Sequence, residues 1–368
     1  MLEFRTSESV NIGHPDKTCD TIADSFLDAA LKHDKNSQMA VECAIKNNKL
    51  FIYGEATTQA KIDYEKIARK VLKQVGYKAE DFEIIKEISE QSPDINQAVV
   101  REELCANDQG IVIGYATNET PEYMPLTLVI AHKIMAKYET FRNQPQNKKR
   151  YFSDAKAQVT VAYENDVPKF IKEIVISVSH SEKVESTELT FDIKEEIIKP
   201  LLYEYGKYWS DNTSIEINPS GKFTIWGSFG DSGCVGRKIV VDSYGGQARV
   251  GGGCFSSKNA TKVDRSAAYY ARYVAKNIVA HKLARKCEIE LAYVIGQAKP
   301  VAIKINCFKT NRKSMNKIYD IVNKNFDFSV SNIIKELDLL KPIYAATTNY
   351  GHFGRDLFTW EQIKDLEK

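Results

Sequence analysis

A glycine-rich loop that leads directly into a helical segment carries the strongest chemical signal in this chain. Residues 251–265 read Gly-Gly-Gly-Cys-Phe-Ser-Ser-Lys-Asn-Ala-Thr-Lys-Val-Asp-Arg. Glycines let the backbone approach an anion closely, and a helix N-terminus presents free N–H groups to it. Lys258 and Lys262 add positive charge, and Asp264 suits a divalent cation that bridges to phosphate oxygens. The loop predicts a polyphosphate site with its metal, although a helix cap formed by Thr261 with the acid three residues later would need no ligand.

A second candidate lies near the N-terminus, where Gly-His-Pro-Asp-Lys occupies residues 13–17. Pro15 suits the first position of a helix, so His14 is expected at the cap and Asp16 in the first turn. A histidine at this place can hydrogen-bond to, or protonate, a phosphate oxygen that gains charge. The alternative for the acid is that it only complements the helix dipole.

Residues 227–238 form another loop punctuated by glycines, and it ends in Arg237 and Lys238. A guanidinium offers a planar fork for phosphate oxygens, and an ammonium offers a point charge. Four glycines directly before the pair favour an anion site, whereas such a pair alone is more often a solvated surface feature.

Isolated charged residues lie in or near the expected strands. Asp154 and Lys156 come just before the second strand pair, where a lysine can project from a strand end. Glu42 and Glu55 fall in the first strand pair. Without further context, the better explanation for Lys156 is an exposed surface lysine, and the better explanation for the two glutamates is the solvent-facing side of their strands.

The elements that must position these residues recur three times as two strands followed by a helix. Alternating apolar and β-branched residues predict the strands, and apolar positions with a period of 3.6 predict the helices. The units are residues 38–45, 50–57 and 62–75; residues 158–163, 169–178 and 189–203; and residues 287–295, 301–308 and 313–323.

The three strand pairs begin at residues 38, 158 and 287, so their spacings are 120 and 129 residues in a chain of 368. We interpret the pattern as an α+β protein of three similar sheet-plus-helix domains, divided at residues 1–100, 101–226 and 227–368. Coincidental spacing is the alternative. Helices cover one face of each sheet, and a second apolar face would have to meet another domain or another chain.

Composition narrows the class of protein. Apolar residues make up 43% and charged residues 27%, as in ordinary globular proteins. Lys plus Arg number 51 and Asp plus Glu 49, so the net charge of +2 gives no reason to expect nucleic acid as a partner. Seven cysteines without a CxxC pair favour a reducing compartment. Without a signal sequence or an apolar run of membrane length, we expect a cytoplasmic enzyme with no membrane partner.

Taken together, the motifs closely resemble those of the S-adenosylmethionine synthetase (methionine adenosyltransferase) family, over residues 6–355. The strings that carry the resemblance are Gly-His-Pro-Asp-Lys at 13–17, Asp-Gln-Gly at 108–110, Gly-Tyr-Ala-Thr-Asn-Glu-Thr at 114–120, Asp-Ala-Lys-Ala-Gln-Val-Thr at 154–160, Gly-Arg-Lys-Ile at 236–239, Gly-Gly-Gly-Cys-Phe-Ser at 251–256, Lys-Val-Asp-Arg-Ser-Ala-Ala-Tyr at 262–269 and Tyr-Gly-His-Phe-Gly-Arg at 350–355.

The resemblance implies a fold, an assembly and a reaction. The three α+β domains would be related by a pseudo-threefold, and two subunits would form a tight homodimer with shared active sites, often paired into a homotetramer. The substrates would be ATP and L-methionine. The methionine sulfur would displace tripolyphosphate from the ribose C5′, and the tripolyphosphate would then be hydrolysed to phosphate and pyrophosphate.

The resemblance also assigns roles to matching positions. Catalytic residues would be His14, Lys156 and Arg237. ATP and its phosphates would be bound by Asp154, Phe223, Asp231, Lys238, Lys258 and Ile295, and also by the catalytic Lys156 and Arg237. Methionine would be bound by Glu55, Gln91, Asp108 and Lys262. Two Mg²⁺ ions would be held by Asp16 and Asp264, and K⁺ by Glu42.

Several positions depart from the family pattern. Cys105, Ala106 and Asn107 stand where the family usually shows Gly-Ala-Gly, and the segment between residues 91 and 108 is shorter than in familiar bacterial members. No charged residue assigned to chemistry is lost. Two other readings of the same motifs are a tripolyphosphate hydrolase that no longer binds methionine, and a regulatory subunit that binds ATP without turnover.

Overall fold

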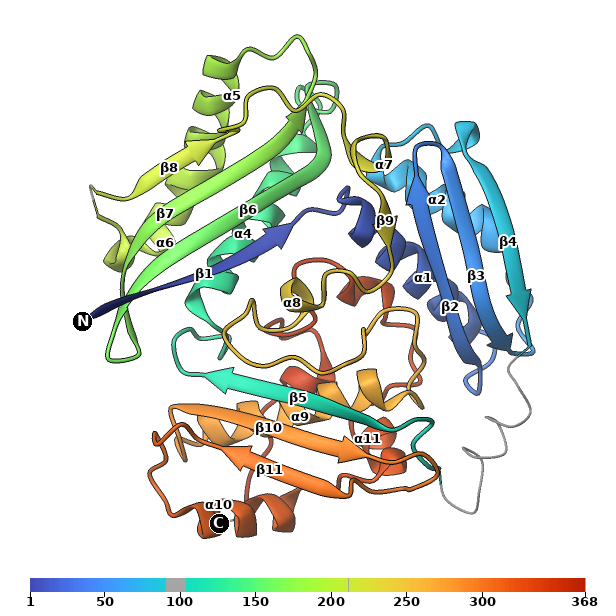
Figure 1. The fold of residues 1–368 in the computed structure, drawn as a ribbon, viewed down its shortest axis with the longest axis vertical. Helices are drawn as coiled ribbons and strands as arrows, with labels where there is room; N and C mark the ends of the chain where they lie inside the picture. Colours follow the sequence, from blue (N-terminus) through green and yellow to red (C-terminus); the bar gives the residue numbers. More distant parts are fainter. Residues whose placement is uncertain (91–103, 211, 368) are drawn as a thin grey trace.

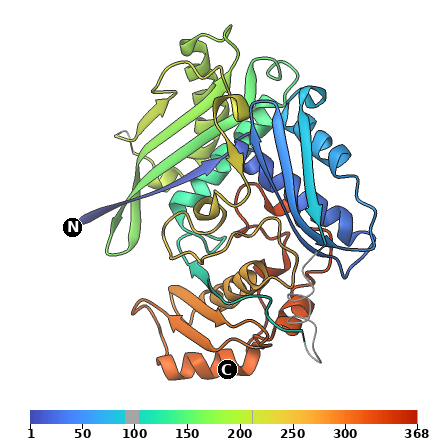
Figure 2. The same ribbon diagram turned by 45° about the vertical axis from the view of Figure 1, so that its right-hand side comes forward.

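The computed structural model describes residues 1–90, 104–210 and 212–367. All three predicted units of two strands and a helix are present, and they belong to three separate sheets (Figure 1). The sheets remain distinct when the molecule is turned (Figure 2). The expected α+β architecture is therefore confirmed.

The N-terminal sheet has four strands in the order β4 (Glu83–Ser89), β3 (Lys49–Thr57), β2 (Gln38–Lys46) and β9 (Gly233–Cys234). Its helices are α1 (Pro15–Leu31) and α2 (Tyr64–Val75). Every second residue of β2, from Met39 to Ile45, is buried. Because side chains alternate across a strand, this face packs against α1, which buries Ile22 and Phe26 in the same apolar cluster.

The central sheet has the order β1 (Leu2–Val10), β6 (Tyr151–Glu164), β7 (Val167–His180) and β8 (Ser214–Ile217). Helix α4 (Leu126–Arg142) packs on β1 and β6. The predicted helix at 189–203 is a helical run made of α5 (Ser186–Ile193), a π-helical segment (Lys194–Ile198) and α6 (Lys199–Glu204).

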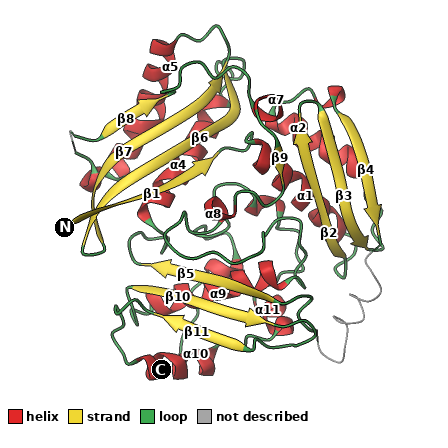
Figure 3. Ribbon diagram, in the orientation of Figure 1, coloured by secondary structure: helices red, strands yellow, loops and turns green. Residues whose placement is uncertain are grey.

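The C-terminal sheet has the order β11 (Ala302–Asn306), β10 (Lys286–Tyr293) and β5 (Gly110–Thr117). Its helices are α9 (Val263–Ala280), α10 (Met315–Asn325) and α11 (Val330–Glu336). Helix α9 packs on β5 and β10, and it buries Tyr269, Tyr270 and Tyr273. In the view of Figure 3, the covering helices α1, α4 and α9 lie behind the strands of their sheets.

Each sheet includes a strand from a distant part of the sequence. Strand β1 pairs with β6, β5 with β10, and β9 with β2, all antiparallel. The sequence division at 1–100, 101–226 and 227–368 therefore does not coincide with the three sheets. A strand taken from elsewhere covers hydrogen-bonding groups that an open sheet edge would leave unpaired.

This exchange places the chemical motifs on connections between sheets. Residues 11–14 join β1 of the central sheet to α1 under the N-terminal sheet. Residues 218–232 lead from β8 to β9, and residues 235–262 lead from β9 to α9. The short helices α7 (Gly227–Gly230) and α8 (Ile239–Asp242) lie on these last two connections. The candidate site is thus built where the three sheets converge.

The strands also carry exposed apolar side chains. Phe4 on β1, Phe51 on β3, Ile85 on β4 and Ile111 on β5 are all exposed, and these strands belong to all three sheets. Phe51 and Ile85 are register neighbours. Within the described residues, none of the helices is both long and apolar enough to cross a membrane.

Candidate functional site

His14 and Asp16 lie at the N-terminus of α1, as the sequence predicts. Pro15 takes the first helical position, and His14 is the N-cap residue. The His14 Nδ1 accepts a hydrogen bond from the Asp16 backbone N–H at 3.2 Å. A neutral imidazole in this arrangement carries its proton on Nε2, which leaves that atom as a hydrogen-bond donor.

The surroundings of His14 favour the neutral ring. Burial, together with the positive charges of Lys238 and Lys156 and against the opposing charge of Asp16, lowers the pKa of His14 to about 4. The ring is therefore a neutral donor near pH 7.

The Asp16 carboxylate joins the second glycine loop to α1. Its Oδ1 accepts the backbone N–H of Cys234 at 3.0 Å, and its Oδ2 accepts Lys238 Nζ at 2.7 Å. Arg237 Nε lies 3.5 Å from Oδ1. Asp16 is buried while Arg237 is exposed, so the guanidinium remains accessible to a ligand.

Lys156 lies within β6 rather than before the strand, because β6 begins at residue 151. It is the register partner of Val10, the last residue of β1. Its ammonium pairs with Glu8 at 2.5 Å and is half exposed. Since β1 leads directly into residues 11–14, the lysine lies near the start of the His14 motif. The first cluster consists of His14, Asp16, Lys156, Asp231, Arg237 and Lys238.

Asp154 is a buried carboxylate two residues before Lys156. It accepts the backbone N–H of Gly227 in α7 at 2.8 Å. Burial raises the pKa of Asp154 to about 6, with a smaller contribution from Asp231, while the Gly227 N–H opposes the shift. Phe223 is half-buried, and its backbone exchanges hydrogen bonds with His180.

A second group of charged residues surrounds the N-terminus of α9. Lys258 Nζ pairs with Asp264 Oδ2 at 2.5 Å. Burial lowers the pKa of Lys262, Glu55 opposes this shift, and Lys258 adds to it; Asp108 and Asp264 oppose it further. The second cluster consists of Glu55, Asp108, Lys258, Lys262 and Asp264.

The helix cap proposed as an alternative for residues 261–264 does not form. The N-cap residue of α9 is Lys262, without a side-chain capping bond. Thr261 Oγ1 instead donates to Gln38 Oε1 on β2 at 2.8 Å. A Cβ on Gly253 would lie 2.2 Å from Asp264 Cγ, so the glycine is needed for the loop to pass this carboxylate.

The two clusters lie on loops that touch each other. A Cβ on Gly236 would lie 2.4 Å from Cys254 Cβ, so the loops meet at that point. Over the described ranges, no hydrogen bond or ion pair joins the first cluster to the second.

Glu42 accepts a hydrogen bond from Tyr53 Oη at 3.3 Å.

Five of the residues predicted from the sequence are not members of either cluster: Asp154, Phe223 and Glu42, described above, and Ile295 and Gln91. Ile295 is exposed just after β10. Gln91 lies outside the described residues.

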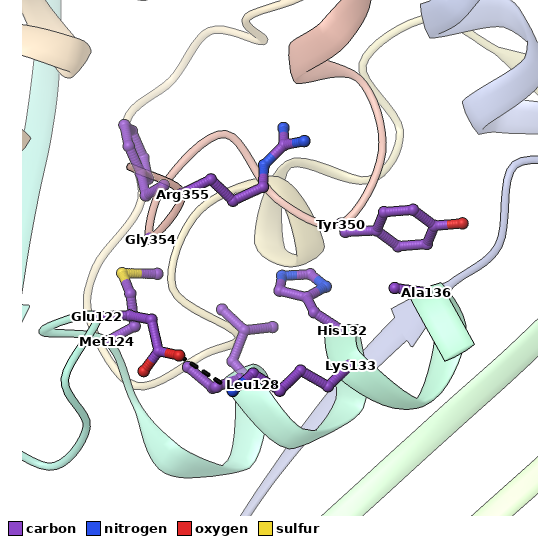
Figure 4. Close-up of a pocket in the computed structure, with 11 residues that line it drawn as sticks. Glu122, Met124, Leu128, His132, Lys133, Ala136, Tyr350, Gly354 and Arg355 are labelled. Carbon is purple, nitrogen blue, oxygen red and sulfur yellow. Dashed lines mark ion pairs between the residues drawn. The ribbon is translucent and has the colours of Figure 1, made fainter. Parts of the chain in front are cut away.

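A separate cavity of about 170 Å³ lies between α4 and residues 350–355. Figure 4 shows His132 and Leu128 on α4 facing this space, with the Glu122–Lys133 ion pair of 3.1 Å at its edge. Its lining is mainly apolar and includes none of the residues predicted for the site. The candidate site is therefore the pair of charged clusters.

A network of buried charged residues, which was not predicted from the sequence, contacts the same loops as the two clusters. Lys17 pairs with Asp20 at 2.9 Å and with Asp242 at 2.5 Å, and Arg265 pairs with Asp24 at 2.7 Å. The signal was present in the sequence, because aspartates recur at every fourth position from residue 16 to residue 28.

The oxygen ligands for a metal ion are spread over the site. Among the residues that the structure covers, no group of three or more His, Cys, Asp or Glu side chains could hold a metal by itself. Asp16 and Asp264 each supply one carboxylate beside cationic side chains. Mg²⁺ is commonly held by one or two carboxylates together with substrate phosphates and water, so these residues fit that ion.

Comparison with known proteins covers nearly the whole chain. Residues 3–120, 103–223 and 225–362 match the models of the N-terminal, central and C-terminal domains of S-adenosylmethionine synthetase. The chain is also 45% identical over 386 aligned positions to an S-adenosylmethionine synthase of Finegoldia magna, covering 99% of this chain and 97% of that protein. The chain therefore belongs to the S-adenosylmethionine synthetase family, whose members make S-adenosylmethionine from ATP and methionine.

Proposed function

We propose that the first and second clusters together form the active site in which this methionine adenosyltransferase joins ATP to L-methionine. One observation carries the proposal. The N-terminus of α1 brings His14 and Asp16 together with Arg237 and Lys238 from a loop more than 200 residues away. That arrangement surrounds an anion site with a helix N-terminus, a neutral donor and two cations.

The chemistry of the reaction matches these residues. A thioether sulfur is already a good neutral nucleophile, so attack on C5′ requires no base. The difficult step is the departure of tripolyphosphate, which leaves with several negative charges. Cationic side chains that are fixed in place stabilise this charge as it develops. In our proposal Lys156, Arg237, Lys238 and Lys258 hold the phosphate chain, and His14 donates a hydrogen bond to the bridging oxygen.

The family depends on metal ions, and we assign two Mg²⁺ ions to Asp16 and Asp264. When bound, Mg²⁺ would neutralise part of the phosphate charge. Both carboxylates are held by lysines, Lys238 and Lys258, which are also phosphate-binding candidates. We assign K⁺ to the half-buried carboxylate of Glu42, which Tyr53 contacts.

The remaining roles follow from the family resemblance and from position. Lys262 is placed for the methionine carboxylate, with Gln91 assigned beside it, and Glu55 and Asp108 are assigned to the amino group. The charges of Glu55 and Asp108 both act on Lys262, which supports one methionine pocket at the second cluster. The nucleoside is assigned to Phe223, with Asp154, Asp231 and Ile295 around it.

We further propose a homodimer with shared active sites, which can pair into a homotetramer. The exposed apolar side chains on strands of all three sheets support a flat interface between two copies. Sharing of the site would also explain why no direct contact joins the two clusters within the described part of one chain. We assign the enzyme to the cytoplasm, in keeping with seven cysteines that include no CxxC pair.

Incubation of the purified protein with ATP, Mg²⁺ and methionine tests the proposal. We expect S-adenosylmethionine, phosphate and pyrophosphate in equal amounts. Cleavage of the triphosphate that does not depend on methionine and yields no S-adenosylmethionine would instead identify a hydrolase. Nucleotide binding without a product would identify a regulatory subunit.

A further inference from the structure

One face of α1 carries an aspartate at every helical turn. Residues four apart lie on the same side of a helix, about 6 Å from each other along its axis. Each of these carboxylates accepts a backbone N–H from a distant segment: Asp16 and Asp20 both bind residues 234–236, Asp24 binds residue 257, and Asp28 binds residues 344–345. The pairs are Asp16 with Cys234 at 3.0 Å, Asp20 with Gly236 at 2.9 Å, Asp24 with Ser257 at 3.0 Å, and Asp28 with Tyr344 at 2.8 Å and Ala345 at 2.9 Å.

The second turn of α1 fixes the loop that carries Arg237 and Lys238. Asp20 binds the backbone N–H of Gly236, directly before this pair. Lys17 bridges Asp20 and Asp242, the last residue of α8, which follows the pair. Contacts with α1 therefore hold the chain both before the two cations, at Gly236, and after them, at Asp242.

The third turn fixes the loop that carries Lys258. Asp24 binds the backbone N–H of Ser257, which has a left-handed φ of 77°. Arg265 of α9 grips Asp24 with two hydrogen bonds of 2.7 Å and also donates to the Lys258 carbonyl at 3.2 Å. The Asp24–Arg265 pair thus holds the Ser257 N–H through the carboxylate and the Lys258 carbonyl through the guanidinium.

The burial of these charges suggests a purpose other than stability. Asp20, Asp24 and Arg265 are at most 1% exposed. A buried ion pair is weak evidence of stabilisation, since apolar residues of similar size often serve as well. A carboxylate that accepts a backbone N–H in a fixed geometry does something that apolar side chains cannot do: it holds a loop at a defined place.

We propose that Asp20 and Asp24 are positioning residues, and that successive turns of α1 set the spacing between the Arg237–Lys238 pair and Lys258. Because Asp20 and Asp24 lie one helical turn apart, the two loops that carry these cations are held about one turn apart along α1. Both loops can then contact one triphosphate chain. This inference rests on the proposed role of these cations in phosphate binding.

The test is a kinetic comparison of Asp20→Ala, Asp24→Ala and Asp28→Ala. Asp28 is the matched control, because it uses the same helix face and the same type of contact to hold residues 344–345, to which no phosphate-binding role is assigned. We expect kcat to fall about tenfold or more for the first two variants, because small misplacements of charged groups are costly in transition states. The KM for methionine should stay within about twofold, and Asp28→Ala should keep kcat within about twofold.

Tripolyphosphate as an inhibitor provides a readout that does not depend on the chemical step. Its inhibition constant should rise for the Asp20 and Asp24 variants and stay unchanged for the Asp28 variant. Asp20→Asn keeps an oxygen for the Gly236 N–H and leaves Lys17 with Asp242, so it should recover part of the loss seen with alanine. If Asp24→Ala does not fold, Asp24→Asn combined with Arg265→Gln removes both charges and takes its place.

Equal losses of kcat in all three positions, at similar losses of melting temperature, would show a purely structural role and overturn the proposal. So would an unchanged kcat in Asp20→Ala. Arg237→Ala and Lys258→Ala separate this outcome from a failure of the proposed function. If these two variants leave tripolyphosphate inhibition unchanged, the phosphate site itself is wrong; if they weaken it while the Asp20 and Asp24 variants behave like Asp28→Ala, only the positioning role is wrong.

Discussion

At the scale of single residues, carboxylates and lysines of the candidate site are paired with each other. Asp16 binds Lys238, and Asp264 binds Lys258. A triphosphate with its metal ions offers each member of such a pair a new partner, because the phosphate attracts the lysine and the metal attracts the carboxylate. The ion pairs therefore hold both groups in place until substrate arrives.

Asp264→Asn tests the metal assignment. The amide is a poorer ligand for Mg²⁺ than the carboxylate, so kcat should fall by orders of magnitude at ordinary Mg²⁺ concentrations while the fold survives. The measurement is the rate of S-adenosylmethionine formation as a function of Mg²⁺, with circular dichroism as the control for folding. Near-normal activity would contradict ligation by Asp264.

Lys156→Ala tests whether this half-exposed lysine contributes to the reaction. Loss of one cation that faces the leaving group should lower kcat about 100-fold or more, as with other donors that stabilise developing charge. Lys169→Ala on β7 is a suitable control, since Lys169 forms a surface ion pair with Glu164. An unchanged rate would leave Lys156 as an ordinary surface residue.

Asp154→Asn should change how stability depends on pH. The pKa of Asp154 is raised from 3.8 to about 6 in the folded protein, so its contribution to stability is complete below pH 4 and is lost as the pH rises through 6. The shift corresponds to about 3 kcal/mol. The melting temperature of the variant minus that of the wild type should therefore be more positive at pH 7.5 than at pH 5. The same difference at both pH values would be inconsistent with the raised pKa.

At the scale of elements, the sequence predicted what local patterns determine. Proline after histidine fixed the start of α1, and alternation predicted the strand pairs of all three sheets. It did not predict pairings that depend on distant partners. β9 has only two residues, and nothing local to them indicates that they pair with β2. The alternative that Thr261 caps α9 was wrong, because its hydroxyl donates a hydrogen bond to Gln38 on β2 instead.

The same limit explains the gaps in the predicted site. Lys258, Lys262 and Asp264 are close in sequence, so their type and spacing identified them. Asp20 and Asp24 act on loops more than 200 residues away, and a local pattern shows only that they share a helix face. Family resemblance supplied the role of Phe223, which no pattern of residue types indicated.

Gly236→Ala tests the contact between the two loops. Gly236 has a φ of 78°, and its Cβ would clash with Cys254. The loop must shift, so kcat should fall at least about tenfold and the melting temperature should drop. Gly246→Ala is the matched control, because Gly246 has a φ of 83° but open space around its Cβ position. Equal effects of the two substitutions would show that backbone conformation alone matters.

At the scale of the whole molecule, the sheets expose apolar side chains opposite their helices. Phe51→Glu combined with Ile85→Glu places two charges on neighbouring positions of β3 and β4. Burial of unpaired charges is costly, so the double variant should have a smaller mass by light scattering and lose activity. Lys73→Glu on the exposed side of α2 should change neither. A wild type that is monomeric at working concentrations would contradict the shared site.

Strands β1, β5 and β9 each pair with a sheet whose other strands lie far away in the sequence. These pairings constrain the order in which the nascent chain can fold. The N-terminal sheet gains its last strand only after residue 234 has left the ribosome, and the central sheet joins residues 2–10 to a hairpin that begins at residue 151. Such long-range closure slows folding and leaves sheet edges open to wrong partners in the meantime. Synthesis that stops before residue 233 would therefore yield a chain in which β2 has lost its β9 partner and presents an unpaired edge to other chains.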